Sequence, residues 1–127
     1  MLPSVESPLA TQNGIDFVII RESSEDFYIR ASGRVKNGKN RHQLEIENGS
    51  LKAKFGLNIE TKGNEIAYQM GVLSRKGCEN VAKYAFEYAK KKNNNMIISV
   101  DKANIMDYYG LWRECFDKIG KGHDGIE

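Results

Sequence analysis

The stretch that decides the fold runs from Ile15 to Tyr28 and reads IDFVIIRESSEDFY. Residues 15–20 form a short apolar run, which is typical of a strand covered on both faces of a sheet. Arg21 follows directly, and Tyr28 comes a few residues later. A guanidinium at a strand end can donate a bidentate pair of hydrogen bonds to a carboxylate. We therefore expect a site here that binds a carboxylate and moves a proton.

A second stretch of the same kind begins at Met96 and reads MIISVDKAN. We expect residues 96–101 to form another buried strand, which ends at Lys102 and Asn104. Burial can lower the pKa of a lysine enough for it to carry a proton near neutral pH. The alternative is a surface lysine paired with Asp101, and the residues alone leave both readings open.

Arg21 and Tyr28 also have plain structural interpretations. Arg21 could form a salt bridge with a carboxylate of the same loop, since Glu22, Glu25 and Asp26 follow it. Tyr28 could be a core residue, and the sequence by itself favours core packing for it. These alternatives also stay open at this point.

Composition limits the class of protein. The chain has 127 residues, 28% of them charged, and a net charge of +2, which suits one soluble domain spanning 1–127. Neither a membrane span nor a signal peptide is evident, so we expect a cytoplasmic protein without a membrane partner. The two cysteines, Cys78 and Cys115, match no metal spacing and are expected to be reduced.

Residues 29–73 are predicted to form an antiparallel arm. Turn dipeptides occur at Asn37-Gly38 and Asn48-Gly49. Between Leu51 and Ile59 apolar and polar residues alternate, which predicts a hairpin that is apolar on one side only. We expect this projecting arm to act as a clasp between two copies of the chain.

Two helices are predicted around the second strand. Ser74 is a suitable N-cap for a helix whose apolar stripe ends near Ala89. The second helix is expected over about 106–119. The order strand, hairpin arm, helix, strand, helix predicts an α/β fold: a mixed sheet with flanking helices and a projecting antiparallel β-hairpin arm.

The sequence offers no metal or nucleotide site of a recognised type. His42 and His123 are isolated, and no glycine-rich phosphate loop is present. Basic residues between Arg30 and Lys54 could form a nucleic-acid arm, but no aromatic residue is interleaved before Phe55. We therefore expect no nucleic-acid partner and no metal ligand in this chain.

Three segments in register resemble the β-decarboxylating dehydrogenases, the family of isocitrate, isopropylmalate, homoisocitrate and tartrate dehydrogenases. Residues 16–28 are similar to the family's Arg-Glu-Asn-(Ser/Thr)-Glu-x-x-Tyr segment. Residues 74–89 resemble the helix after the arm, and residues 100–114 resemble the Lys-x-Asn segment with the helix that follows it. The match covers most of residues 4–120.

The resemblance implies oxidation of a 2-hydroxy acid by NAD or NADP, followed by decarboxylation assisted by Mg²⁺ or Mn²⁺. It implies that Arg21 binds substrate carboxylates and that Tyr28 protonates the enol carbon. Lys102 would assist proton transfer at the hydroxyl, in the Tyr28 site of the other subunit of a homodimer. Asn104 would lie beside the nicotinamide and the substrate.

The same resemblance implies that the chain is a central fragment, inactive by itself, because the metal-binding aspartates and the cofactor domain would lie outside it. No cofactor is therefore expected to bind tightly to this chain alone. Isocitrate is slightly favoured as the substrate; the alternative is a 3-isopropylmalate, homoisocitrate or tartrate enzyme. A non-catalytic dimerisation or regulatory module of the same fold is the other alternative.

Overall fold

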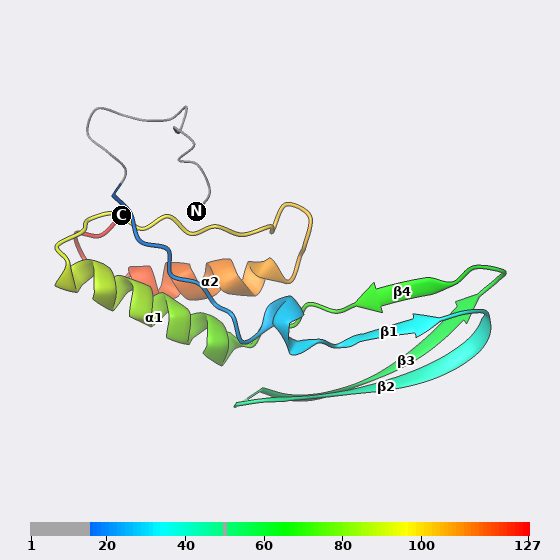
Figure 1. Cartoon of the computed structure of the whole chain (residues 1–127). Helices are drawn as coiled ribbons and strands as arrows, with labels where there is room; N and C mark the ends of the chain where they lie inside the picture. Colours follow the sequence, from blue (N-terminus) through cyan, green and yellow to red (C-terminus); the bar gives the residue numbers. More distant parts are fainter. Residues whose placement is uncertain (1–15, 50) are drawn as a thin grey trace, which may run out of the picture.

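The computed structural model describes residues 16–49 and 51–127. Two helices lie side by side, and a curved β-arm projects from one end of the pair (Figure 1). Segments without regular secondary structure run along the helix pair: residues 16–25 lead toward the arm, and residues 94–108 connect the first helix to the second. The α/β class with flanking helices and a hairpin arm is therefore confirmed.

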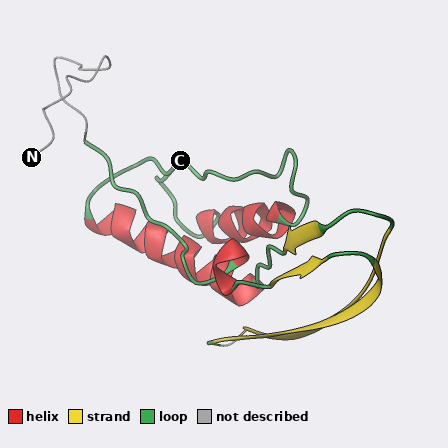
Figure 2. Cartoon of the chain, turned by 45° about the vertical axis from the view of Figure 1, so that its right-hand side comes forward, coloured by secondary structure: helices red, strands yellow, loops and turns green. Residues whose placement is uncertain are grey.

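The arm consists of two separate antiparallel pairs of strands (Figure 2). Strand β1 (Ser32–Val35) pairs with β4 (Ile66–Gln69), and the longer β2 (Gly38–Asn48) pairs with β3 (Leu51–Thr61). In Figure 1 the β2–β3 hairpin curves back beneath β1 and β4. The tip of this hairpin therefore returns toward the helix pair and does not extend away from it.

The turns of the arm depend on glycine. Gly38, Gly49 and Gly63 all have positive φ, at 86°, 57° and 71°, a region that residues with a Cβ rarely adopt. The alternation predicted for Leu51 to Ile59 is confirmed, since the apolar residues of β3 are half-buried and the polar ones exposed. The turns and the β2–β3 pair are thus specified by residues close together in the chain, whereas β1 and β4 pair across the whole of that hairpin.

The helix pair forms the larger core. Helix α1 (Arg75–Lys91) begins at the predicted cap, where the Ser74 side chain accepts a hydrogen bond from the Gly77 N–H at 3.0 Å. Helix α2 (Tyr109–Gly120) begins somewhat later than expected. The buried residues of the two helices are small or aromatic: Cys78, Ala82, Ala85, Phe86, Ala89 and Cys115.

The mixed sheet is a correction, because both sheets of the described residues are antiparallel. Neither segment expected to supply a buried strand belongs to a sheet: residues 16–20 and 96–101 have no strand, and Ile15 lies outside the described residues. Most of their apolar side chains are exposed, with Ile19 at 76% and Val100 at 80%, while Ile20 and Ile97 are half-buried. An apolar run indicates suitability for a strand, but a strand also needs a hydrogen-bonded neighbour.

The end of the chain supplies a small part of that pairing. The Ile97 N–H donates to the Glu127 carbonyl at 2.7 Å, and the Glu127 N–H donates to the Asn95 carbonyl at 2.8 Å. The His123 ring stacks on Phe86 with 5.0 Å between centroids, so the C-terminal residues do contribute to packing. Among the described residues, neither helix is long and apolar enough to cross a membrane.

Candidate functional site

Two carboxylates shape the loop that carries Arg21 and Tyr28. Glu22 accepts hydrogen bonds from the Ser24 N–H and hydroxyl and from the Glu25 N–H, the last at 2.8 Å. Glu25 is buried and accepts from the Ser74 N–H at 2.7 Å and from the Ser74 hydroxyl at 2.6 Å. A carboxylate is favoured at this position by the positive end of the dipole of α1. The loop is thereby fixed to the start of α1.

Gly77 makes room for this contact. A Cβ at Gly77 would lie 2.5 Å from the carboxylate atoms of Glu25, closer than any real contact of that kind. The buried Glu25 and the first turn of α1 therefore fit together only because residue 77 has no side chain.

Arg21 and Tyr28 lie together in the structure. The guanidinium carbon of Arg21 is 5.1 Å from the centre of the Tyr28 ring, within the range of a cation–π contact. Arg21 forms no salt bridge with any described residue, and the acidic residues that could have paired with it are engaged elsewhere: Glu22, Glu25 and Asp26. Its guanidinium thus has no ion-pair partner in the part of the chain that the structure describes, and it is suited to binding an external carboxylate.

Tyr28 is half exposed, at 49%, in the short 3-10 helix η1 (Asp26–Ile29). It lines a cavity of about 450 Å³ between its own loop and the last residues of β2, Glu45 to Asn48. The Asn48 amide donates a hydrogen bond to the Ser24 carbonyl, so the hairpin tip contacts this loop directly. The core interpretation of Tyr28 is therefore wrong, because the ring lies at the surface.

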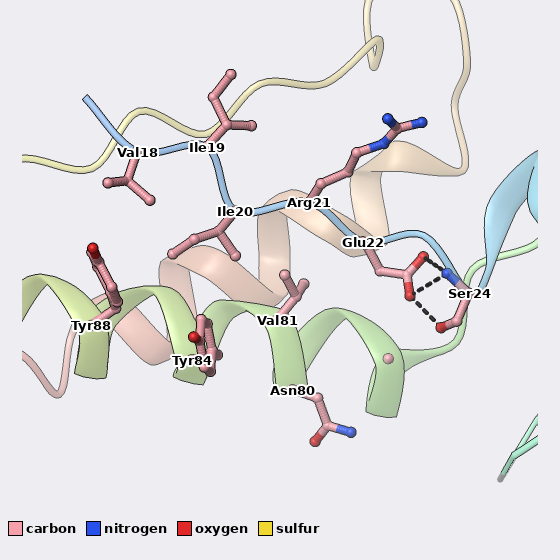
Figure 3. A pocket seen from close by; sticks show the side chains of 11 residues that line it. Val18, Ile19, Ile20, Arg21, Glu22, Ser24, Asn80, Val81, Tyr84 and Tyr88 are labelled. Atoms are coloured by element: carbon pink, nitrogen blue, oxygen red, sulfur yellow. Dashed lines mark hydrogen bonds between the residues drawn. The ribbon is translucent and has the colours of Figure 1, made fainter. Parts of the chain in front are cut away.

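A second cavity, of about 520 Å³, lies between residues 18–24 and the outer face of α1 (Figure 3). Figure 3 shows Ile20 directed toward Val81 on α1, and Arg21 directed away from that helix. Tyr84 and Tyr88 stack against each other along the same groove, with 6.4 Å between centroids. The guanidinium of Arg21 is thus turned toward Tyr28 and away from the wall formed by α1.

Lys102 and Asn104 occupy a separate exposed turn before α2. The Lys102 carbonyl accepts hydrogen bonds from the N–H groups of Ile105 and Met106, at 2.9 and 2.8 Å. Asp101 is not the partner of Lys102, because its carboxylate forms a bidentate pair with Arg113 at 2.8 and 2.9 Å. That pair holds the pKa of Asp101 below its ordinary value. Lys102 therefore remains free of the partner that the surface interpretation required.

No hydrogen bond, salt bridge or ring contact of the described residues joins Lys102 or Asn104 to Arg21 or Tyr28. The structure of one chain thus gathers the predicted residues into two pairs on different segments. Sequence reasoning missed the contact that links these segments, in which the Asp26 carboxylate accepts hydrogen bonds from Tyr108 and Tyr109. The contact joins residues far apart in the chain, and no periodic pattern in the sequence predicts it.

A metal site needs several donor side chains that converge on one point. The described residues contain no group of three or more His, Cys, Asp or Glu side chains that could hold a metal ion. The sequence contains no glycine-rich phosphate loop either. The described residues therefore do not fit a complete metal or dinucleotide site.

The chain is an α/β domain in which Arg21 and Tyr28 lie together at the surface. The sequence model of the isocitrate/isopropylmalate dehydrogenase family matches residues 2–127, and the chain belongs to that family. Family members are dehydrogenases, some of them decarboxylating, and in general depend on NAD(P) and a metal.

Relatives with different substrates match over nearly the whole chain. A probable tartrate dehydrogenase/decarboxylase of Bacillus subtilis is 30% identical over 99% of this chain. A 3-isopropylmalate dehydrogenase of Clavibacter sepedonicus is 28% identical, also over 99%. The chain spans 29% of the length of each of these relatives.

A solved isocitrate dehydrogenase from Methylococcus capsulatus superposes with a TM-score of 0.54 at 26% identity, over 81% of this chain and 24% of that one. The likeness therefore extends to the fold as well as to the sequence.

Proposed function

We propose that this chain is the substrate-binding and dimerisation domain of an NAD(P)- and metal-dependent enzyme that oxidatively decarboxylates a 2-hydroxy acid. The observation that carries the proposal is the pairing of Arg21, which has no ion-pair partner among the described residues, with the exposed Tyr28. A guanidinium suits a carboxylate, and a phenol beside it suits proton transfer to the same substrate.

Each of the four residues has a distinct role. The Arg21 guanidinium donates hydrogen bonds to a substrate carboxylate and fixes its orientation. The Tyr28 hydroxyl delivers a proton to the carbon that loses carbon dioxide. The Lys102 ammonium exchanges a proton with the substrate hydroxyl, and the Asn104 amide orients the substrate beside the nicotinamide. When bound, the cofactor and metal supply hydride acceptance and charge stabilisation.

Two copies of the chain are needed to bring these residues together. No hydrogen bond or ring contact joins Tyr28 to Lys102 in the described part of the chain, and both residues are exposed. We infer that Lys102 enters the Tyr28 site of a partner subunit across a two-fold axis. The hairpin β2–β3, which has a half-buried apolar face, is the proposed clasp of this dimer.

The exposed apolar segments favour pairing with further residues in a longer protein. Residues 16–20 and 96–101 carry strand-like sequences with exposed apolar side chains. We infer that both become strands of one sheet when residues beyond the described ranges pair with them. The isolated chain is accordingly expected to be inactive.

The substrate is a 2-hydroxy acid that carries further carboxylates. The sequence leans toward isocitrate, while relatives named for tartrate and isopropylmalate support those alternatives equally. A single missing or additional polar contact can change preference among such substrates by orders of magnitude. A panel of the three acids therefore distinguishes them.

The test is an assay of the complete gene product with each acid, NAD or NADP, and Mg²⁺ or Mn²⁺. Tyr28→Phe and Lys102→Met are each expected to lower kcat by roughly 10²- to 10⁴-fold. Arg21→Lys is expected mainly to raise KM, by about tenfold or more, because lysine lacks the bidentate fork. Lys76→Met, at an exposed position of α1, is the matched control and should leave both constants unchanged.

Two results would contradict the proposal. The first is a wild-type protein that forms dimers but turns over none of the acids, which would favour the non-catalytic dimerisation module. The second is full activity of Tyr28→Phe and Lys102→Met, which would remove both residues from the chemistry.

A further inference from the structure

The strongest unassigned feature is a three-residue cluster, Asp26, Tyr108 and Tyr109, which we name the Asp26 latch. The Tyr108 hydroxyl donates to Oδ1 of Asp26 at 2.6 Å, and the Tyr109 hydroxyl donates to Oδ2 at 2.5 Å. The two tyrosine rings stack with 4.9 Å between centroids. Hydrogen bonds from hydroxyls to a carboxylate are among the strong ones in proteins, and here both oxygens are used.

The local backbone is arranged to make this contact. Asp26 has a φ of 61°, an uncommon conformation for a residue with a side chain, and its N–H donates to the Val72 carbonyl at 2.8 Å. A Cβ at Gly71 would lie 2.3 Å from the Tyr108 hydroxyl oxygen and 2.6 Å from Oδ1 of Asp26. Glycine at position 71 and the left-handed Asp26 are therefore both required for the carboxylate to reach the tyrosines.

The latch joins the two segments that carry the proposed chemistry. Asp26 begins η1, which contains Tyr28, and Tyr109 is the first residue of α2. The turn of Lys102 directly precedes Tyr108 and contacts it, since the Tyr108 hydroxyl also lies 3.7 Å from the sulfur of Met106. Among the described residues, the two hydrogen bonds of Asp26 are the only ones between residues 26–30 and 101–109.

We propose that Asp26 is a positioning residue, which holds Tyr28 and the Lys102 turn of one subunit in fixed relation through Tyr108 and Tyr109. The inference rests on the proposed function, in which Tyr28 acts in one site of the dimer and Lys102 of the same chain acts in the other. The latch therefore connects the two active sites through the body of each subunit. Loosening it displaces a proton-transfer group in both sites at once.

The experiment uses the complete gene product and the variant Tyr108→Phe/Tyr109→Phe, which keeps both rings and removes both donors. Asp26→Asn, which keeps one amide oxygen as an acceptor, is the second variant. The matched control is Tyr84→Phe, which removes the hydroxyl of an exposed tyrosine of α1 outside the latch. Hydrogen–deuterium exchange of residues 25–30 and 101–107 is measured beside kcat and KM.

The double variant is expected to exchange faster in both segments and to lose about ten- to hundredfold in kcat, because displacements near 1 Å have effects of this size. KM should stay within about twofold, since Arg21 still binds the substrate. Asp26→Asn should fall between the double variant and the wild type. Tyr84→Phe should leave exchange in the two segments and both kinetic constants unchanged.

Unchanged exchange in both segments of the double variant would overturn the latch, whatever the kinetics. Faster exchange with an unchanged kcat would overturn its positioning role. An inactive wild-type protein would instead contradict the proposed function, and the latch would then be judged by the exchange data alone.

Discussion

The helix pair and the two extended segments, residues 16–20 and 96–101, all carry large apolar side chains, but these are buried in the helix pair and mostly exposed in the extended segments. Phe86 of α1 is 6% exposed, whereas Ile98 is 74% exposed. A helix satisfies its own backbone hydrogen bonds, and a hairpin pairs with its sequence neighbour, so both form from nearby residues. A central strand needs partners on both edges. The difference separates the elements that form from local interactions from the two segments that lack hydrogen-bonded partner strands among the described residues.

The largest expected effect contrasts these regions directly. Phe86→Ala should lower the free energy of unfolding of the chain by about 3–5 kcal/mol, because Phe86 packs against Phe116 and His123. Ile98→Ala should change it by less than about 0.5 kcal/mol in the isolated chain. Urea denaturation of both variants measures the difference. Equal losses of unfolding free energy in the two variants would contradict the difference in burial between Phe86 and Ile98.

The same Ile98→Ala substitution should have a larger effect on stability in the complete gene product. If residues 96–101 become a covered strand there, Ile98→Ala should cost about 2–5 kcal/mol in that protein. A cost that remains near zero in the complete protein would mean that Ile98 stays exposed and that the inferred sheet does not form.

Glu25 lies where the loop after residues 16–20 contacts the start of α1. Glu25→Ala should lower the free energy of unfolding by about 1–3 kcal/mol, because it leaves the half-buried donors of Ser74 without their acceptor. Glu87→Ala, at an exposed position of the same helix, is the control and should have little effect. Similar losses in the two variants would mean that the capping contact does not anchor the loop.

Tyr109 gives a pH-dependent signal from its contact with Asp26 at the start of α2. The hydrogen bond to Asp26, with burial, raises the pKa of Tyr109 to about 12. Its contribution to stability is therefore fully present below the unfolded pKa near 10 and is lost as pH rises through about 12. Near-ultraviolet titration of tyrosinate should show a late-ionising tyrosine that shifts to lower pH in Asp26→Asn. An unshifted titration curve would contradict this assignment.

The smallest effect concerns the cysteines inside the packed region. Burial, with a smaller effect of neighbouring Cys115, raises the pKa of the Cys78 thiol to about 12. Both cysteines are buried, so neither should react with a thiol reagent near neutral pH until the chain unfolds. Two labels on the unfolded chain and none on the folded chain are expected, and rapid labelling of the folded chain would contradict the packing of α1 on α2.

The features that the sequence predicted correctly are those specified by neighbouring residues. The Ser74 cap, the turn at Asn48-Gly49 and the alternation along β3 each depend on a few consecutive positions. The strand expected over 96–101 was wrong for the described chain because its partners are not encoded nearby. Its apolar residues indicated only that a strand there would need neighbouring strands to pair with.

The candidate site shows the same division. The sequence identified Arg21 and Tyr28 as a possible pair but could not exclude a salt bridge for Arg21, because Glu22 and Glu25 are closer in sequence. The structure shows that Glu22 binds Ser24 and that Glu25 binds Ser74. The Asp26 latch was not predictable, since it depends on the packing of the loop against α2.

The central claim is that Tyr28 and Lys102 form one site from two subunits, and mixed dimers test it most directly. Tyr28→Phe and Lys102→Met proteins, each inactive, are unfolded together, refolded and assayed. Random mixing should make about half of the dimers mixed, each with one intact site, so activity should recover to about a quarter of wild type. A mixture no more active than its two parents would contradict the shared site.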